Sequence, residues 1–168
     1  MGKYSAGILI YSYDPNGCVT FLLGRDFRNM YSDFGGRSEP TDISHMDTAA
    51  REFYEETCGS VYDIPIVKEK IRKSHIVHSL SYLGNPYYMY MVYVPYSNQQ
   101  LSRFDDIRRL ISNNPNIDNR FKEKLDLQWF TGNEILNKRN CMRQVFYRSF
   151  THNINYINHM TARKVLKH

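Results

Sequence analysis

Hydrophobic and polar residues along the chain alternate with a period that suits strands in some segments and helices in others. Two runs, AGILIYSY at 6–13 and VTFLLGRD at 19–26, predict strands joined by a turn at DPNG. Further strands are predicted at 70–83, at the tyrosine-rich 87–96, and at 125–130. Because helix-like tracts separate these strands, the pattern predicts a mixed α/β protein.

One helix start is marked by side chains that can cap the free N–H groups of a first turn. Ser44 and Asp47 have the spacing of a capping box, which predicts a helix beginning near His45. This helix is expected to end around Cys58, with Gly59 as the left-handed residue that stops it.

Three more helices are predicted downstream. Ser102 and Asp105 form a second possible capping box, ahead of a short helix in RFDDIRRLI, and TGNEIL predicts a turn that opens into a brief helix. From about Asn140 the long, aromatic and basic segment predicts a single C-terminal helix. No repeat, low-complexity tract or linker divides the 168 residues, so we expect one domain, 1–168.

Composition narrows the class of protein. Hydrophobic residues make up 42% of the chain, as in folded globular proteins, and no apolar run approaches the roughly 20 residues of a membrane-spanning helix. We therefore expect no membrane association. Three scattered cysteines without a CxxC pair argue against a disulfide framework and a zinc site, and favour a cytoplasmic setting. His75 and His78 are the one ligand-like histidine pair, for which solvated or substrate-edge positions are preferred to metal binding.

The stretch REFYEE holds the strongest chemical signal. Residues three or four apart share a helix face, so Glu52, Glu55 and Glu56 gather together, and Arg51 lies four residues from both Glu55 and Asp47. Clustered carboxylates repel each other more strongly as they become buried, and hard cations such as Mg²⁺ or Mn²⁺ relieve that repulsion. Taken alone, an exposed acidic helix face is the simpler interpretation.

Together with the residues around it, the stretch resembles the signature of the Nudix hydrolases, GX5EX7REUXEEXGU, in which U is a bulky apolar residue. The match begins at Gly36 and includes Arg51, Glu52, Phe53, Glu55, Glu56 and Gly59. There are three departures: Asp42 replaces the first glutamate, eight residues instead of seven follow it before Arg51, and Cys58 is extra before Gly59. Both extra residues lie at helix ends, where loops absorb insertions at little cost.

The resemblance implies a Nudix-type α/β/α sandwich with a central mixed sheet and a C-terminal helix. It also implies Mg²⁺- or Mn²⁺-dependent hydrolysis of a nucleoside diphosphate linked to another group, X. Carried over by position, the metal ligands are Glu52, Glu56, Glu55 and the Gly36 carbonyl, while Arg51 orients the glutamates.

The general base is less well defined, because the family uses either a glutamate of the signature, here Glu52, or one on a later loop. Glu123 stands six residues before Trp129 and resembles the E-x5-W arrangement of several Nudix enzymes, including dinucleoside-tetraphosphate hydrolases. Glu123 is therefore a candidate base and further metal ligand, equally compatible with an ordinary loop glutamate, and Asp126 is the alternative.

The substrate is the most open part of the hypothesis. Arg25 and Arg37 flank the glycine pair and could hold phosphate oxygens. The segment 101–119 lengthens a region where the family often builds specificity. Some of the tyrosines between 87 and 96 could stack on a base, although most such strand aromatics simply pack: Tyr87, Tyr88, Tyr90, Tyr93 and Tyr96.

The net charge of +5 and the pI near 9.1 favour an anionic, pyrophosphate-containing partner. An mRNA cap fits this charge, which would also make RNA a partner. Free nucleotides, dinucleoside polyphosphates and diphosphoinositol polyphosphates fit almost as well. The alternatives are a catalytically silent Nudix-like module that binds nucleotide or RNA, and a basic RNA-binding protein with an incidental acidic helix. The sequence does not indicate an oligomeric state.

Overall fold

The computed structural model describes residues 3–165, with side chains up to Ala162. Met1, Gly2 and residues 166–168 lie outside the described part, and with them the last basic residues of the predicted C-terminal helix.

Within residues 3–165, seven strands form one mixed sheet: β1 (Ser5–Tyr13), β2 (Val19–Asp26), β3 (Tyr31–Ser32), β4 (Phe34–Arg37), β5 (His75–Leu80), β6 (Pro86–Tyr93) and β7 (Lys124–Thr131). β1 lies at the centre and pairs in parallel with β6. Its C-terminal half pairs antiparallel with β2 and its N-terminal half with β4, so β2 and β4 share one side of β1. β7 pairs with β2 and β5 with β6.

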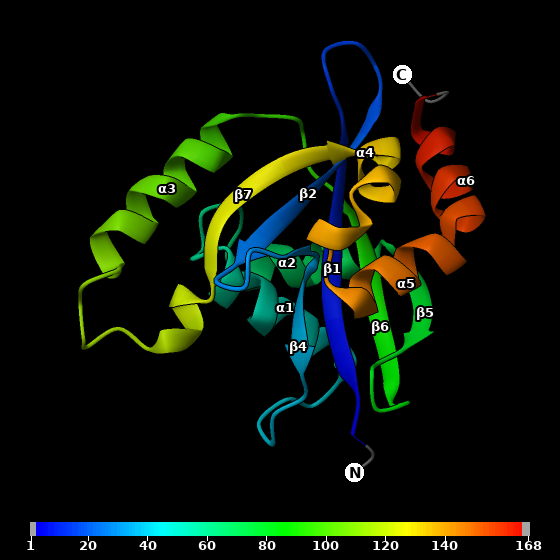
Figure 1. The fold of residues 1–168 in the computed structure, drawn as a ribbon. Helices are drawn as coiled ribbons and strands as arrows, with labels where there is room; N and C mark the ends of the chain where they lie inside the picture. Colours follow the sequence, from blue (N-terminus) through cyan, green and yellow to red (C-terminus); the bar gives the residue numbers. More distant parts are fainter. Residues whose placement is uncertain (1–2, 166–168) are drawn as a thin grey trace.

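Helices cover both faces of this sheet (Figure 1). The α-helices in the described chain are α1 (His45–Glu56), α2 (Ile64–Arg72), α3 (Gln99–Ile111), α4 (Gly132–Asn137), α5 (Gln144–His152) and α6 (Ile154–Val165). Short 3₁₀ turns occur at η1 (Asn119–Lys122) and η2 (Arg139–Cys141). The predicted α/β/α sandwich with a central mixed sheet is confirmed.

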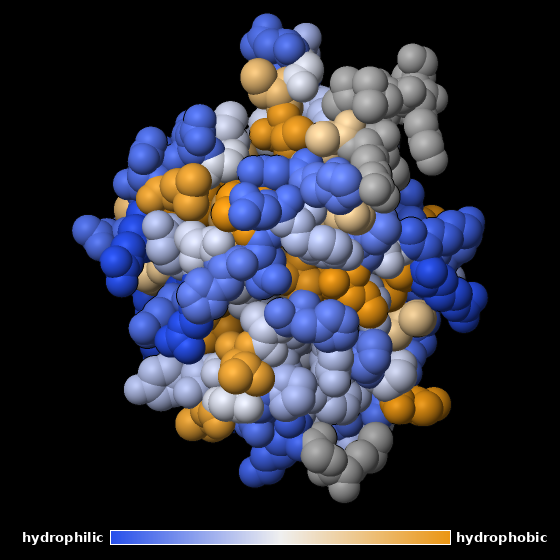
Figure 2. Space-filling view, turned by 90° about the vertical axis from the view of Figure 1, so that its right-hand side faces the viewer, coloured by the Kyte–Doolittle hydropathy of each residue, from blue (hydrophilic) through white to orange (hydrophobic). Residues whose placement is uncertain are grey.

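The two layers of core follow from the alternation of side chains along the strands. Ile8 and Ile10 of β1 face a cluster that includes Phe53 of α1 and Val67 of α2. Leu9, between them, faces the other cluster, which includes Phe21 of β2 and Phe146, Phe150 and Ile157 of α5 and α6. The outer surface on the side of α6 and β5 is largely hydrophilic, with separate apolar patches (Figure 2). No helix in the described chain is long and apolar enough to span a bilayer.

The strand predicted at 70–83 is shorter than expected. Only His75–Leu80 is extended, and Lys70 to Arg72 form the last turn of α2. Asp63 caps this helix, because its side chain accepts a hydrogen bond from the Ile66 N–H, and a proline occupies its first turn. Asp63 and the proline therefore mark the start of a helix in a region whose apolar residues had predicted a strand from residue 70 onward.

The second predicted capping box is wrong. α3 begins at Gln99, so Ser102 lies inside the helix and its hydroxyl donates to the Asn98 carbonyl instead of capping. The single C-terminal helix is also wrong, because the chain divides into α5 and α6 at Asn153, whose side-chain amide donates to the Ser149 carbonyl. Figure 1 shows α6 running in a different direction from α5.

The glycine pair, Gly35 and Gly36, lies in strand β4. Gly35 of β4 pairs with Gly7 of β1, and the two backbones approach closely. A Cβ added to Gly7 would lie 2.6 Å from the Phe34 carbonyl oxygen and 2.8 Å from the Gly35 Cα. This contact holds the N-terminal end of the Nudix-like signature against the central strand.

We predict that Gly7→Ala destabilises the protein by about 2–4 kcal/mol, because β4 must move away from β1 to make room for the methyl group. Gly132→Ala is the matched control, since the nearest atom to its added Cβ, on Phe21, is 3.9 Å away. The control should remain within about 1 kcal/mol of the wild type. Urea titration followed by circular dichroism measures both, and equal midpoints for the two variants would contradict the close-contact argument.

Candidate active site

The helix that carries the glutamates begins as predicted. Ser44 accepts a hydrogen bond from the Asp47 N–H, and the Asp47 carboxylate accepts one from the Ser44 N–H, so the capping box is confirmed. The helix ends at Glu56, two residues before the predicted Cys58.

The end of α1 is a Schellman-type arrangement. The Gly59 N–H donates to the Tyr54 carbonyl at 3.0 Å, and the Cys58 N–H donates to the Glu55 carbonyl at 3.2 Å. Left-handed backbone begins at Cys58 (φ 53°) and continues at Gly59 (φ 63°). The extra residue of the signature therefore takes the position that glycine was expected to hold, at a conformational cost of about 1 kcal/mol for a residue with a side chain.

The three glutamates of α1 are largely hidden from solvent. Glu55 and Glu56 are only 7% and 5% exposed, so the interpretation of REFYEE as an exposed acidic face is wrong. Glu56 accepts a hydrogen bond from the Gly35 N–H at 2.8 Å. Glu52 lies against Gly36, where an added Cβ would come within 2.4 Å of the Glu52 Oε1. The glycine pair therefore lets the helix and its carboxylates approach β4.

Arg51 lies at the centre of this acidic group. Its guanidinium donates to Asp42, to Glu52 at 2.9 Å and to Glu55 at 3.2 Å. It does not reach Asp47, which pairs instead with Lys68 on α2. Arg51 is thus the shared partner of three carboxylates, in agreement with its expected orienting role.

Asp42, which stands where the signature has glutamate, also takes part in this network. Besides Arg51, its Oδ2 accepts hydrogen bonds at 2.8 Å from the Thr48 hydroxyl and from the Glu39 N–H. The loop before α1 is therefore tied to the helix by the substituted residue.

A second group of charges comes from the segment that leads into β7. Arg120 approaches Glu55 to 3.1 Å. The Lys124 side chain is only 2% exposed; its ammonium donates to the Ser32 hydroxyl at 2.8 Å and lies 3.4 Å from Glu56. Glu123, between them, lines the same cavity as the α1 glutamates. Sequence reasoning identified Glu123 but missed both cations, since nothing in their local pattern distinguishes them from other basic residues.

Burial governs the electrostatics of the site. It raises the pKa of Glu56 to about 8; Lys124 opposes the shift, and the carboxylates of Glu52 and Glu123 add to it. Burial likewise raises the pKa of Glu52 to about 7, against the effect of Arg51. The surroundings of these carboxylates therefore disfavour their negative charge. Additional cations close to them would lower the energetic cost of that charge.

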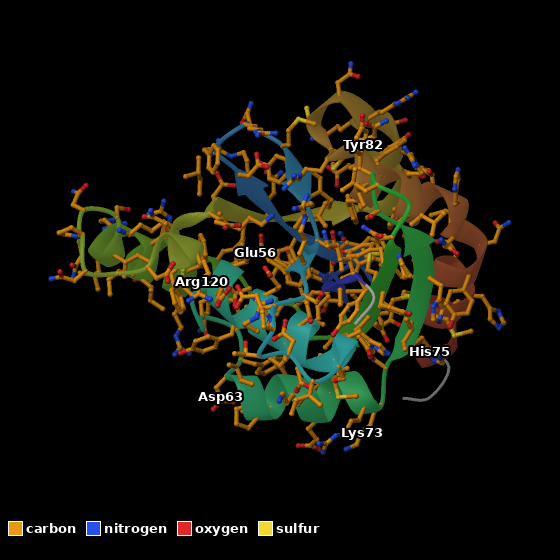
Figure 3. All side chains as sticks on the ribbon, turned by 90° about the horizontal axis from the view of Figure 1, so that it is seen from below. Glu56, Asp63, Lys73, His75, Tyr82 and Arg120 are labelled. Carbon is orange, nitrogen blue, oxygen red and sulfur yellow. The ribbon has the colours of Figure 1, made fainter. Side chains whose placement is uncertain are left out.

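A cavity of about 750 Å³ is lined by Glu52, Glu55, Glu56, Arg120 and Glu123, among other residues. Its lining joins the α1 glutamates, β4, the tip of the β5–β6 hairpin and the start of α5. Figure 3 shows Arg120 and Tyr82 on opposite sides of Glu56. A buried pair, Asp33 and Tyr87, also contributes; the Tyr87 hydroxyl donates to the Asp33 carboxylate, and burial raises the pKa of Asp33 to about 6.

Other predicted residues lie in different surroundings. Arg37 lines the cavity, whereas Arg25 is not among its described lining residues and its guanidinium is bound by Asp126. Asp126, the alternative base, is thus already paired. Among the five tyrosines considered for base stacking, Tyr87 lies on the described cavity wall. The others have aromatic neighbours: Tyr88 and Tyr90 near His45, Tyr93 near Tyr11 and Tyr13, and Tyr96 near Trp129.

In the part of the chain that is described, no three His, Cys, Asp or Glu side chains converge closely enough to hold a metal ion. Arg51, Arg120 and Lys124 form ion pairs with Glu52, Glu55 and Glu56, respectively. The donor set nevertheless has the right chemistry, since hard divalent cations prefer carboxylate oxygens of this kind. His75 and His78 lie at the surface of β5 beside Tyr156 and Tyr88.

We predict that Arg51→Gln lowers the free energy of unfolding by about 3 kcal/mol, because it leaves buried carboxylates without their shared cation. Arg109→Gln is the control; the Arg109 side chain is 79% exposed and its change should cost less than about 0.5 kcal/mol. Urea titrations in the presence of a chelator measure both values. An Arg51 variant as stable as the control would show that the network contributes little to folding.

No protein-family model matches the chain, and no curated protein matches it. Solved structures do resemble it. The C-terminal domain of mouse MUTYH, solved in complex with human PCNA, has a TM-score of 0.56 at 11% identity and covers 93% of this chain and 90% of its own. A C. elegans Ap4A hydrolase has a TM-score of 0.53 at 14% identity, with 90% and 98% covered. A mutT/nudix family protein from Listeria innocua has a TM-score of 0.52 at 13% identity, with 98% and 97% covered. At these identities the likeness concerns architecture, and the chain has the fold found among Nudix and MutT proteins.

Proposed function

We propose that the protein is a Mg²⁺- or Mn²⁺-dependent hydrolase of the pyrophosphate bond in a nucleoside diphosphate linked to another group. One observation carries this proposal: Glu52, Glu55 and Glu56 from a single helix and Glu123 from a separate segment line the same cavity. The proposal agrees with the Nudix-like signature and with the fold.

The residues that would hold the metal are Glu52, Glu55, Glu56 and Glu123, with the carbonyl of Gly36. A bound divalent cation would neutralise the pyrophosphate and lower the pKa of a coordinated water. The side chains of the protein would orient these ligands and supply the general base.

Hydrogen bonds from neighbouring residues orient the glutamates of α1. Arg51 holds Glu52 and Glu55 on one side of α1, and the Gly35 N–H fixes one oxygen of Glu56. Glu123 is the proposed general base, because it is exposed to the cavity and makes no hydrogen bond of its own among those described.

Cationic side chains indicate an anionic substrate. Lys3, Arg37, Arg120 and Arg143 all line the cavity, and Arg37 and Lys3 are exposed. Guanidinium and ammonium groups arranged around one cavity suit several phosphate groups in a row. Arg25, bound to Asp126 outside the described lining, stays a prediction as a phosphate ligand.

The far end of the cavity favours a substrate with an aromatic base. At the tip of the β5–β6 hairpin, Tyr82 and Leu83 are 74% and 68% exposed and both line the cavity. An exposed tyrosine ring beside an anion-binding region suits the stacking of a nucleobase. Diphosphoinositol polyphosphates lack such a planar face, so we favour nucleotides, dinucleoside polyphosphates and capped RNA over them.

The silent binding module remains the second candidate, and one observation favours it. Arg51, Arg120 and Lys124 already neutralise the glutamates in this structure, as they would in a protein that binds no metal. Binding of Mn²⁺ followed by electron paramagnetic resonance separates the two functions. Saturable binding that Glu56→Gln weakens at least tenfold supports the hydrolase, and its absence together with tight nucleotide or RNA binding supports the module.

We predict that Glu56→Gln abolishes turnover, with kcat reduced by roughly 10³-fold or more, while the protein remains folded. The control is Glu69→Gln on α2, an exposed residue paired only with Lys73 in the described network. The assay is a product-resolved panel with Mg²⁺ and Mn²⁺ that covers nucleoside triphosphates, dinucleoside polyphosphates, capped RNA, ADP-ribose and diphosphoinositols. Full activity of Glu56→Gln would exclude the proposed role of α1.

We predict that Tyr82→Ala raises KM for a nucleotide substrate roughly tenfold with little change in kcat, because stacking on a base contributes about 1–3 kcal/mol. Tyr82→Phe keeps the ring and should retain the wild-type KM. Steady-state kinetics on the best substrate of the panel provide both values. If the Ala and Phe variants behave alike, the hairpin tip does not contact a base.

A further inference from the structure

The segment 119–124, here called the Glu123 segment, brings several charges to the glutamates of α1. Arg120 meets Glu55, and Lys124 meets Glu56. Glu123 lies between these two cations and also lines the cavity. The position of this short segment therefore decides how far Glu123 lies from the glutamates of α1.

Arg108 of α3 binds the backbone of this segment on both sides of Glu123. Its Nε donates to the Lys124 carbonyl at 2.9 Å, and its Nη2 donates to the Lys122 carbonyl at 3.0 Å. The third nitrogen, Nη1, donates to the Ser112 hydroxyl at 2.6 Å, which fixes the guanidinium to the end of its own helix. A planar guanidinium can make all three bonds at once, whereas a lysine ammonium cannot match this fork.

α3 is itself firmly placed. Phe104 is fully buried in the core cluster on the α1 side of the sheet, and α3 packs along β7. β7 pairs only with β2 among the described strands, so its outer backbone groups are free to be bound by a neighbouring helix. Arg108 is half-buried between α3 and this edge. It is not among the described residues of the cavity wall.

The extra residue of the Nudix-like signature forms a second anchor. The Cys58 thiol, at the end of α1, donates to the Phe121 carbonyl at 3.1 Å. The Glu123 segment is therefore held from α1 through Cys58 and from α3 through Arg108. The thiol is a weak donor, so Arg108 is expected to be the stronger of the two anchors.

We propose that Arg108 is a positioning residue that sets the place of Glu123 relative to the glutamates of α1. This inference rests on the proposed function, in which Glu123 acts on the substrate. It assigns α3 a supporting role at the site, in contrast to the substrate specificity that the sequence suggested for 101–119. Misplacement of a reacting group by about 1 Å can cost roughly 10²-fold in rate.

The test compares Arg108→Gln, Arg108→Lys and the control Arg109→Gln, the next residue on α3, whose side chain is 79% exposed. We expect Arg108→Gln to lower kcat at least tenfold with KM within about twofold, because substrate contacts are untouched while Glu123 shifts. Arg108→Lys should recover part of the loss by restoring one hydrogen bond, and Arg109→Gln should keep the wild-type kcat. Assays run well below the melting temperature of every variant.

A double-mutant cycle decides whether Arg108 acts through Glu123. In a Glu123→Gln background, Arg108→Gln should lower kcat by less than about twofold further. An equal loss in both backgrounds would indicate a general structural role and overturn the proposal, as would the absence of any loss in the single variant.

Amide hydrogen exchange of residues 119–124 keeps this test separate from that of the proposed function. Faster exchange in Arg108→Gln, with the rest of the chain unchanged, supports the anchoring of the segment; unchanged exchange overturns it. A wild-type protein that hydrolyses nothing in the panel would refute the proposed function and the catalytic part of this inference. The exchange result would then still decide the anchoring part.

Discussion

The structure depends on one electrostatic constraint, which is the burial of several carboxylates between α1 and the sheet. Moving a carboxylate out of water costs several kcal/mol unless a partner compensates for it. Arg51 compensates three of these carboxylates, because its single guanidinium donates to Asp42, Glu52 and Glu55. The close contact of β1 and β4 matters for the same reason, since the glycines let α1 approach until a backbone N–H can bind Glu56.

The residues that depart from the Nudix-like signature make contacts near these buried carboxylates. Aspartate is one methylene shorter than glutamate, and the additional residue before Arg51 gives the loop the length to bring Asp42 to the guanidinium and to Thr48. Cys58 lies just beyond the other end of the helix, and its thiol donates to the segment of Glu123. Both insertions lie where α1 meets a loop.

Much of the fold could be predicted from local pattern. The apolar runs of β1 and β2, the DPNG turn and the Ser44 capping box are encoded within a few neighbouring residues, and each agrees with the structure. The predictions that were wrong concern segments whose residues suit more than one structure. Ser102 has capping spacing but lies within a helix, and Asp63 caps α2 ahead of a stretch whose apolar pattern resembles a strand.

The site was only partly predictable because half of it is assembled across the sheet. The glutamates of α1 share a helix face, so their spacing revealed them. Arg120 reaches the same cavity, and Lys124 reaches Glu56, from a segment more than sixty residues later, and Tyr82 comes from a hairpin between them. No period in the sequence connects these positions, since the pairing of β7 with β2 and of β5 with β6 is what brings them together.

The cationic side chains around the glutamates differ in how easily each could be displaced from its carboxylate. Arg120 is 45% exposed and its partner Asp118 is also at the surface, so its side chain can leave Glu55 at little cost. Lys124 is buried at 2% exposure and donates to the Ser32 hydroxyl, so leaving Glu56 would also break a buried hydrogen bond. Arg51 pairs with several carboxylates at once, so the loss of one of these pairs leaves it bound to the others. Arg120 is therefore the cation that can leave the glutamates at the lowest cost, while Lys124 stays beside Glu56 and continues to offset its charge.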